Sequence, residues 1–94
     1  MRKINFKAEL WIYPGPTPWH FISLPKKESE EIKAASGPRR GWGAVKVKAR
    51  IGETNWVTSI FPDKKTNTYI LPIKLEVRKK ENLKAGQKVE LTLE

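Results

Sequence analysis

Alternation of apolar and polar residues along three segments is the feature that most restricts the fold of this chain. Residues 4–12, 43–51 and 88–94 each place an apolar side chain at every second position. A two-residue period is that of a β-strand with one buried face and one solvated face. Three shorter β-prone segments, bounded by turn residues, bring the strand candidates to six: residues 4–12, 19–24, 43–51, 56–61, 69–71 and 88–94. The pattern predicts a mainly β chain that forms a small barrel-like sheet.

Two short helices are predicted between the strands. Pro25 suits the first turn of a helix, and the run KKESEEIKAA after it carries its acids in the first half, as the helix macrodipole favours. Pro72 ends a strand because it has no amide donor, and its fixed dihedral suits the start of a second helix over residues 73–80. Helices this short are expected to lie on the barrel, since they would not be stable alone.

The length and composition restrict the class of protein. With 94 residues the chain is expected to form a single domain over residues 1–94, because two separate cores would each be very small. No apolar run approaches the roughly 20 residues of a membrane span. The sequence has no cysteine, which excludes disulfides and thiolate metal sites and favours a cytoplasmic location.

The charge balance is strongly basic. Nineteen Lys and Arg residues against ten acids give a net charge of +9. Such an excess attracts phosphate backbones and anionic surfaces. The lysines are spread along the whole chain, however, and this distribution is also typical of solvated strand faces. Two interpretations of this charge stay open: it only keeps the protein soluble, or it serves to bind a polyanion.

Residues 56–78, WVTSIFPDKKTNTYILPIKLEVR, carry two motifs, TSIFPD and LPIK followed by VR. At this separation the two motifs resemble those of a family of small prokaryotic domains, the domain of unknown function 1905. Further matching motifs are FKAEL at residues 6–10, WHF at 19–21 and LKAG at 83–86, so the resemblance covers nearly the whole chain. The resemblance implies a small double-split (pseudo) β-barrel of about six to seven strands with one or two short helices. It implies no activity, because the function of that family is not established.

The C-terminal run, residues 71–91, is also similar to part of another family. Its strand, Leu-Pro step, helix, glycine turn and strand resemble those of AbrB-like transition-state regulators. Those proteins are intertwined dimers that bind DNA. This similarity implies a homodimer as the alternative to a monomer.

Enzymatic chemistry has little support in the sequence. His20 is the only imidazole, so a nucleophilic triad would have to rest on it, and its position between Trp19 and Phe21 favours a structural role. One histidine and one aspartate do not make a usual metal site without several converging glutamates. The chain is therefore predicted to be non-enzymatic, with no catalytic residue, no metal and no cofactor.

Lys74 and Arg78 are the leading candidates for a binding site. Their spacing of four places both cations on one face of the second predicted helix, and Lys74 lies near its first turn, where backbone amides also attract anions. Trp19 and Trp42 are candidates for an aromatic wall beside them. The alternative is that the two cations pair with Asp63, Glu81 or another acid and only hold the helix on the barrel.

Asp63 and Trp56 also have structural explanations. Pro62 is expected in a turn-rich connection over residues 61–67, and Asp63 is expected to cap the turn after it or to pair with one of the two cations. Trp56 shares its strand face with Ile60 and is expected in the core, although it is also a candidate for the pocket beside Trp19.

A basic strand face supports a different partner. Alternation over residues 43–51 places three cations on one side, and two arginines precede them in a glycine-rich loop; these candidates are Arg39, Arg40, Lys46, Lys48 and Arg50. The leading hypothesis is a binding module for an anionic small molecule. The alternative is a DNA- or RNA-binding protein. Neither hypothesis identifies the ligand or the pathway.

Overall fold

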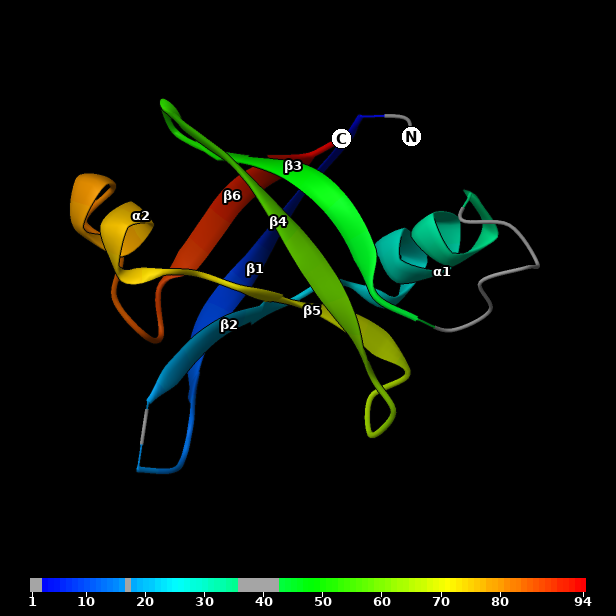
Figure 1. The fold of residues 1–94 in the computed structure, drawn as a ribbon, viewed down its shortest axis with the longest axis horizontal. Helices are drawn as coiled ribbons and strands as arrows, with labels where there is room; N and C mark the ends of the chain where they lie inside the picture. Colours follow the sequence, from blue (N-terminus) through cyan, green and yellow to red (C-terminus); the bar gives the residue numbers. More distant parts are fainter. Residues whose placement is uncertain (1–2, 17, 36–42) are drawn as a thin grey trace.

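The computed structural model describes residues 3–16, 18–35 and 43–94. These residues contain six strands and two helices, joined by turns and loops. The strands are β1 (Ile4–Tyr13), β2 (Trp19–Ser23), β3 (Val45–Ile51), β4 (Thr54–Asp63), β5 (Thr68–Pro72) and β6 (Lys88–Leu93), and the helices are α1 (Lys26–Ala35) and α2 (Leu75–Lys80) (Figure 1). The predicted mainly β fold with two short helices is confirmed. Arg39, Arg40 and Trp42 lie outside the described residues.

The strands close into a barrel in the order β1-β2-β5-β4-β3-β6, and all neighbours are antiparallel. The two longest strands, β1 and β4, each change partner along their length. Residues 4–9 of β1 pair with β6, whereas residues 10–13 pair with β2. Residues 54–60 of β4 pair with β3, whereas residues 61–63 pair with β5. Along β1 and β4, one part of the strand therefore pairs with one neighbour and the rest pairs with the other. The barrel is split along these two strands.

The predicted alternation fills the barrel interior. On β3 and β6 six inward residues are at most 4% exposed, namely Val47, Ala49, Ile51, Val89, Leu91 and Leu93, while Val45 at the start of β3 is only partly buried. The prediction was wrong for Ile12, which is 43% exposed. Ile12 pairs with His20 close to the tip of the β1–β2 hairpin, where the hairpin extends beyond the packed interior.

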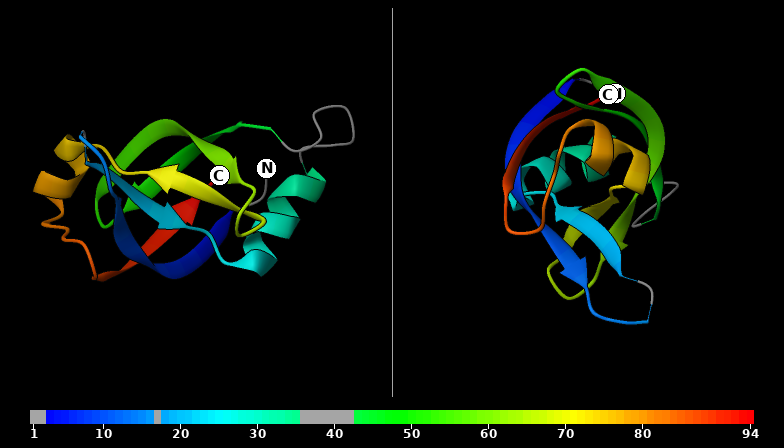
Figure 2. Two further views of the ribbon diagram at one scale, coloured as in Figure 1. Left: turned by 90° about the horizontal axis from the view of Figure 1, so that it is seen from below. Right: turned by 90° about the vertical axis from the view of Figure 1, so that its left-hand side faces the viewer.

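The two helices lie at opposite ends of the barrel (Figure 2). On α1, Ser29 and Ile32 are buried, and the buried Ser29 Oγ accepts a hydrogen bond of 3.0 Å from the Tyr69 amide of β5. On α2, Val77 is buried. No helix among the described residues is long and apolar enough to cross a membrane.

Two predicted boundaries change in the structure. The second helix begins at Leu75 rather than residue 73, because the Ile73 amide donates to the His20 carbonyl at 2.9 Å and Lys74 keeps an extended backbone. Pro62 was expected in a turn, yet it lies in β4 opposite Tyr69. Its missing amide donor is tolerated there because β4 ends one residue later.

Candidate functional site

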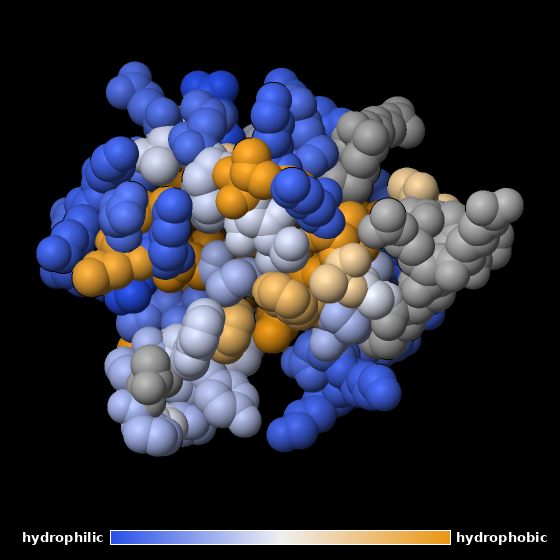
Figure 3. All heavy atoms as spheres, in the orientation of Figure 1, coloured by the Kyte–Doolittle hydropathy of each residue, from blue (hydrophilic) through white to orange (hydrophobic). Residues whose placement is uncertain are grey.

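A groove of about 390 Å³ lies where β4 and β5 separate. Before residues 61–63, β4 pairs with β3 alone, while the chain after β5 turns away into α2. The residues that line the groove are Pro18, Trp19, His20, Trp56, Val57, Thr58, Pro72, Ile73, Lys74 and Arg78. Hydrophobic side chains gather over β4 and β5 in the middle of this face, with hydrophilic side chains to the left, above and below (Figure 3).

The groove brings together three of the residues predicted to form the site, Lys74, Arg78 and Trp19. Lys74 immediately precedes α2 and is exposed, and Trp19 begins β2 with 56% of its surface exposed. Trp56 of β4 packs against the hydrophobic core and also lines the groove, so both roles considered for it apply. Trp42, the fourth predicted member, lies outside the described residues.

Arg78 is held in place by two hydrogen bonds. Its Nε donates to the Ile73 carbonyl at 3.1 Å, and its Nη1 lies 3.2 Å from His20 Nε2. An arginine can only donate, so His20 Nε2 must accept and the neutral ring carries its proton on Nδ1. That Nδ1 atom is buried and has no hydrogen-bond partner among the described residues.

Neither Lys74 nor Arg78 pairs with a carboxylate. Across residues 3–16, 18–35 and 43–94 the only ion pair joins Lys3 Nζ to Glu94 Oε1, at 3.8 Å. The alternative in which the two cations pair with Asp63 or Glu81 is therefore wrong. Their charges are not neutralised by this part of the chain.

The carboxylates considered as partners are used elsewhere. Asp63 caps its own turn, as predicted: its Oδ1 accepts from the Lys65 amide at 3.1 Å and its Oδ2 from the Thr66 hydroxyl at 3.2 Å. Glu81, at the end of α2, accepts a hydrogen bond of 2.6 Å from the Thr54 hydroxyl. This bond ties the β3–β4 hairpin to α2.

The expected contribution of helix amides to anion binding stays a prediction. The helix α2 has six residues, and the amides of Val77 and Arg78 donate to the Lys74 carbonyl at 3.1 and 3.2 Å. The cationic side chains that line the groove are those of Lys74 and Arg78.

Comparison with known families identifies one match. The sequence model of a domain of unknown function, DUF1905, matches residues 6–93, which is nearly the whole chain. The chain belongs to the DUF1905 family. A comparison with curated proteins found no significant match. The resemblance inferred from the TSIFPD and LPIK motifs is confirmed, and the similarity to AbrB-like regulators stays a prediction. Because the description of DUF1905 names no activity, function has to be inferred from the groove and the surface.

The predicted basic face of this DUF1905 protein lies on β3. Lys46, Lys48 and Arg50 are all exposed there. The β4 residues opposite them are neutral in every case: Ser59, Val57 and Asn55 respectively. The other two cations predicted for this surface, Arg39 and Arg40, lie outside the described residues.

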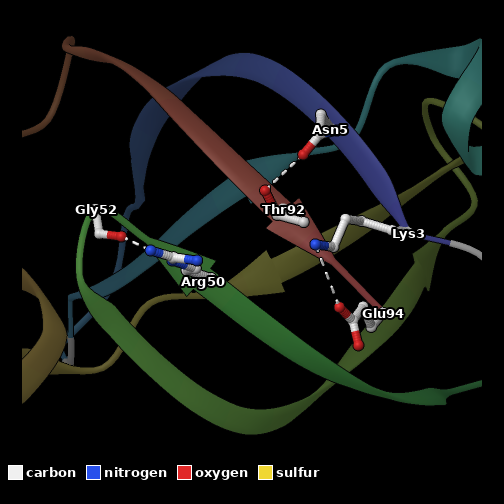
Figure 4. Close-up of polar contacts among 6 residues, drawn as sticks. All are labelled: Lys3, Asn5, Arg50, Gly52, Thr92 and Glu94. Carbon is white, nitrogen blue, oxygen red and sulfur yellow. Dashed lines mark hydrogen bonds and ion pairs between the residues drawn. The ribbon is translucent and has the colours of Figure 1, made fainter.

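Beside this face lies a hollow of about 320 Å³, in which a carboxylate offsets part of the positive charge. It includes Lys48 and Arg50, but also Lys3 and its partner Glu94 (Figure 4). Arg50 points toward the turn after β3, where its Nε donates to the Gly52 carbonyl at 2.9 Å. An anion in this hollow would meet the Glu94 carboxylate, whereas none of the described residues that line the groove carries a carboxylate.

Sequence reasoning missed the contact between His20 and Arg78. The alternation of β2 places His20 on the inward face, but nothing in the sequence indicates that the strand ends at a groove shared with α2. In the described part of the DUF1905 chain, no three side chains among His, Asp and Glu gather where they could hold a metal ion.

Proposed function

We propose that this DUF1905 protein is a non-enzymatic binding module for a small anionic ligand that also carries a planar or apolar group. The observation that supports this function is that one groove contains two tryptophans and two cations that have no acid partner among the described residues. The volume of about 390 Å³ lies in the range of small-ligand sites, roughly 300–1,000 Å³.

Arg78 would bind the anionic group. Its hydrogen bonds to Ile73 and His20 fix the orientation of the guanidinium before any ligand arrives. Two of its five N–H donors are used in these bonds, which leaves three for a phosphate or carboxylate. Lys74 would supply a second positive charge, and its longer reach would let it adapt to the ligand.

Trp19 and Trp56 would bind the rest of the ligand. Both side chains line the groove, from β2 and β4, together with Pro72. Aromatic and apolar walls beside a few polar groups are typical of sites that bind small molecules. The ligand expected here is therefore an amphiphilic anion rather than a bare inorganic ion.

The absence of an enzymatic role is part of the proposal. His20 is the only histidine of the sequence. Its Nε2 accepts from Arg78 and its Nδ1 is buried, an arrangement that suits a support for Arg78 better than a general base. We also keep the cytoplasm as the expected compartment, which imaging of a tagged protein would test.

An NMR titration of the ¹⁵N-labelled protein tests the proposed function. Phenyl phosphate and adenosine 5′-monophosphate should shift the signals of Lys74, Arg78 and the Trp19 indole at lower concentrations than inorganic phosphate. Adenosine, which lacks the anionic group, should shift them weakly. If no anion of this set shifts those signals, or if adenosine acts as strongly as its monophosphate, the proposed function is wrong.

Nucleic-acid binding by the β3 face is the second candidate function. It is favoured by the exposed row of Lys46, Lys48 and Arg50, which faces no acid on β4. Binding to this face would weaken steeply with salt. It would also weaken when Lys46 and Lys48 are both changed to Glu, and an unchanged affinity in that variant would exclude this surface. The monomeric or homodimeric state can be measured in the same samples.

A further inference from the structure

Four aromatic side chains cover the outer face of the β1–β2 hairpin. The strand register sets Trp11 opposite Phe21 and Tyr13 opposite Trp19. Ile22, the next residue on β2, is fully buried, so these four alternate positions face away from the core. The four residues, named here the hairpin aromatic face, do not belong to the hydrophobic core.

The rings of the hairpin aromatic face are ordered against one another. Trp19 and Phe21 are stacked with centroids 6.2 Å apart and an interplanar angle of 10°, and Trp11 lies 5.2 Å from Phe21. Trp11 is also fixed by a hydrogen bond of 2.9 Å from its Nε1 to Ser23 Oγ. Tyr13 and Trp19 keep 52% and 56% of their surface exposed, so no described element covers them.

This face is continuous with the groove. Trp19 belongs to both, and Phe21 lies opposite Pro72, another residue that lines the groove. Lys74 and Arg78 therefore lie at the edge of an exposed aromatic surface. An extended ligand with both rings and anionic groups could contact the two features together.

The positive charge of the protein indicates which partner would bind to the hairpin aromatic face. The other outward positions at the centre of this face are uncharged: Ser23, Ile70 and Pro72. A second copy would bring another net charge of +9 to a surface edged by cations. A nucleic-acid strand brings phosphates for the cations and bases for the rings. Only a single strand offers its base faces to aromatic side chains.

We propose that the hairpin aromatic face and the groove together bind single-stranded nucleic acid, an inference that rests on the proposed function of the groove. Phosphates contact Lys74 and Arg78, and successive bases stack on Trp19 and Tyr13. This surface differs from the β3 face, which would contact phosphates alone. It also explains why large aromatic rings stay exposed on an outer strand face.

Fluorescence anisotropy with labelled oligothymidine and oligouridine of about 12 nucleotides tests this inference, since single-strand sites span about 4–16 nucleotides. Tyr13→Ala should weaken binding about tenfold, because stacking of one base contributes roughly that much. Tyr13→Phe, which keeps the ring, should bind like the wild type. Leu75→Ala removes a side chain that is equally exposed but lies on α2, and it should have no effect. The far-ultraviolet circular dichroism and melting temperature of each variant verify its folding.

Several results would overturn the inference. One is an unchanged affinity in Tyr13→Ala, and another is binding of duplex DNA or heparin as tight as that of the single strands. A third is loss of binding only when the charges of Lys46 and Lys48 are reversed by change to Glu. Adenosine 5′-monophosphate, titrated into the same variants, separates this inference from the proposed function. If the mononucleotide shifts Lys74 and Arg78 while oligonucleotides bind no more tightly, the groove binds small anions and the inference fails alone. If neither ligand binds, both fail.

Discussion

The side chains of Arg78 and His20 lie 3.2 Å apart, Nη1 to Nε2, although the two residues are 58 positions apart in the chain. The contact joins the end of the β1–β2 hairpin to α2. It also fixes the orientation of a cation that no carboxylate of the described residues neutralises. Arg78 is thus oriented by a neutral partner, and its charge remains available to a ligand.

The tautomer of His20 is a direct prediction of this contact. Because Nε2 accepts from arginine, the neutral ring should carry its proton on Nδ1. Long-range ¹H–¹⁵N NMR correlations of the single histidine report which nitrogen is protonated. A neutral ring protonated on Nε2 would contradict the hydrogen bond.

Replacing His20 should affect the groove through Arg78. In His20→Ala the guanidinium keeps its bond to the Ile73 carbonyl but loses its second anchor, so affinity for phenyl phosphate should fall several-fold. His20→Gln can return an acceptor near the Nε2 position and should recover part of the loss. Equal affinities for wild type and His20→Ala, measured by calorimetry, would show that the anchor is unimportant.

Ser29 should contribute to stability in spite of its polarity. Its buried hydroxyl accepts from the Tyr69 amide, and Ser29→Ala would remove this acceptor from a buried donor at a cost of about 1–3 kcal/mol. Ser23→Ala is the matched control, since Ser23 accepts from Trp11 at a partly buried site and water can replace it. Urea denaturation should show the larger loss for Ser29→Ala. A loss in Ser23→Ala of the same size would contradict the assignment.

Alanine substitutions at three glycines should distinguish the loss of stability caused by backbone strain from the loss caused by steric contact. Gly52 has a φ of +59°, and an added Cβ would collide with the Glu81 carboxylate, whereas Gly86 has a φ of +89° and open space around it. Gly86→Ala should cost about 1–2 kcal/mol of stability from the backbone alone. Gly52→Ala should cost more, because Glu81 must also move away from Thr54. Gly15→Ala, in open space and without a positive φ, should be near neutral. If urea denaturation shows a larger loss of stability for Gly86→Ala than for Gly52→Ala, this reasoning is wrong.

Much of the fold follows from local pattern. Alternation identified the buried residues of β3 and β6, and Pro72 correctly marked the end of β5. Ile12 and Pro62 were misplaced because the exposure of a strand end and the tolerance of a proline depend on which strand is the partner. Local spacing does not contain that information.

The candidate site was predictable only in part. The spacing of Lys74 and Arg78 indicated a pair of cations, and Trp19 was a reasonable neighbour. The contribution of His20 and the double role of Trp56 depend on the split of β4 between two partners. The pairing with Asp63 failed because a local turn offered that carboxylate two nearer donors, on Lys65 and Thr66.

Calorimetric titration of phenyl phosphate into the wild type, Lys74→Glu and Lys80→Glu tests anion binding in the groove most directly. The two variants carry the same change of charge at either end of α2, but only Lys74 lines the groove. Lys74→Glu should weaken binding by at least about tenfold, as expected for a lost charge-assisted contact, and Lys80→Glu by about twofold at most. Equal losses in both variants, or no loss in Lys74→Glu, would show that the groove is not the anion site.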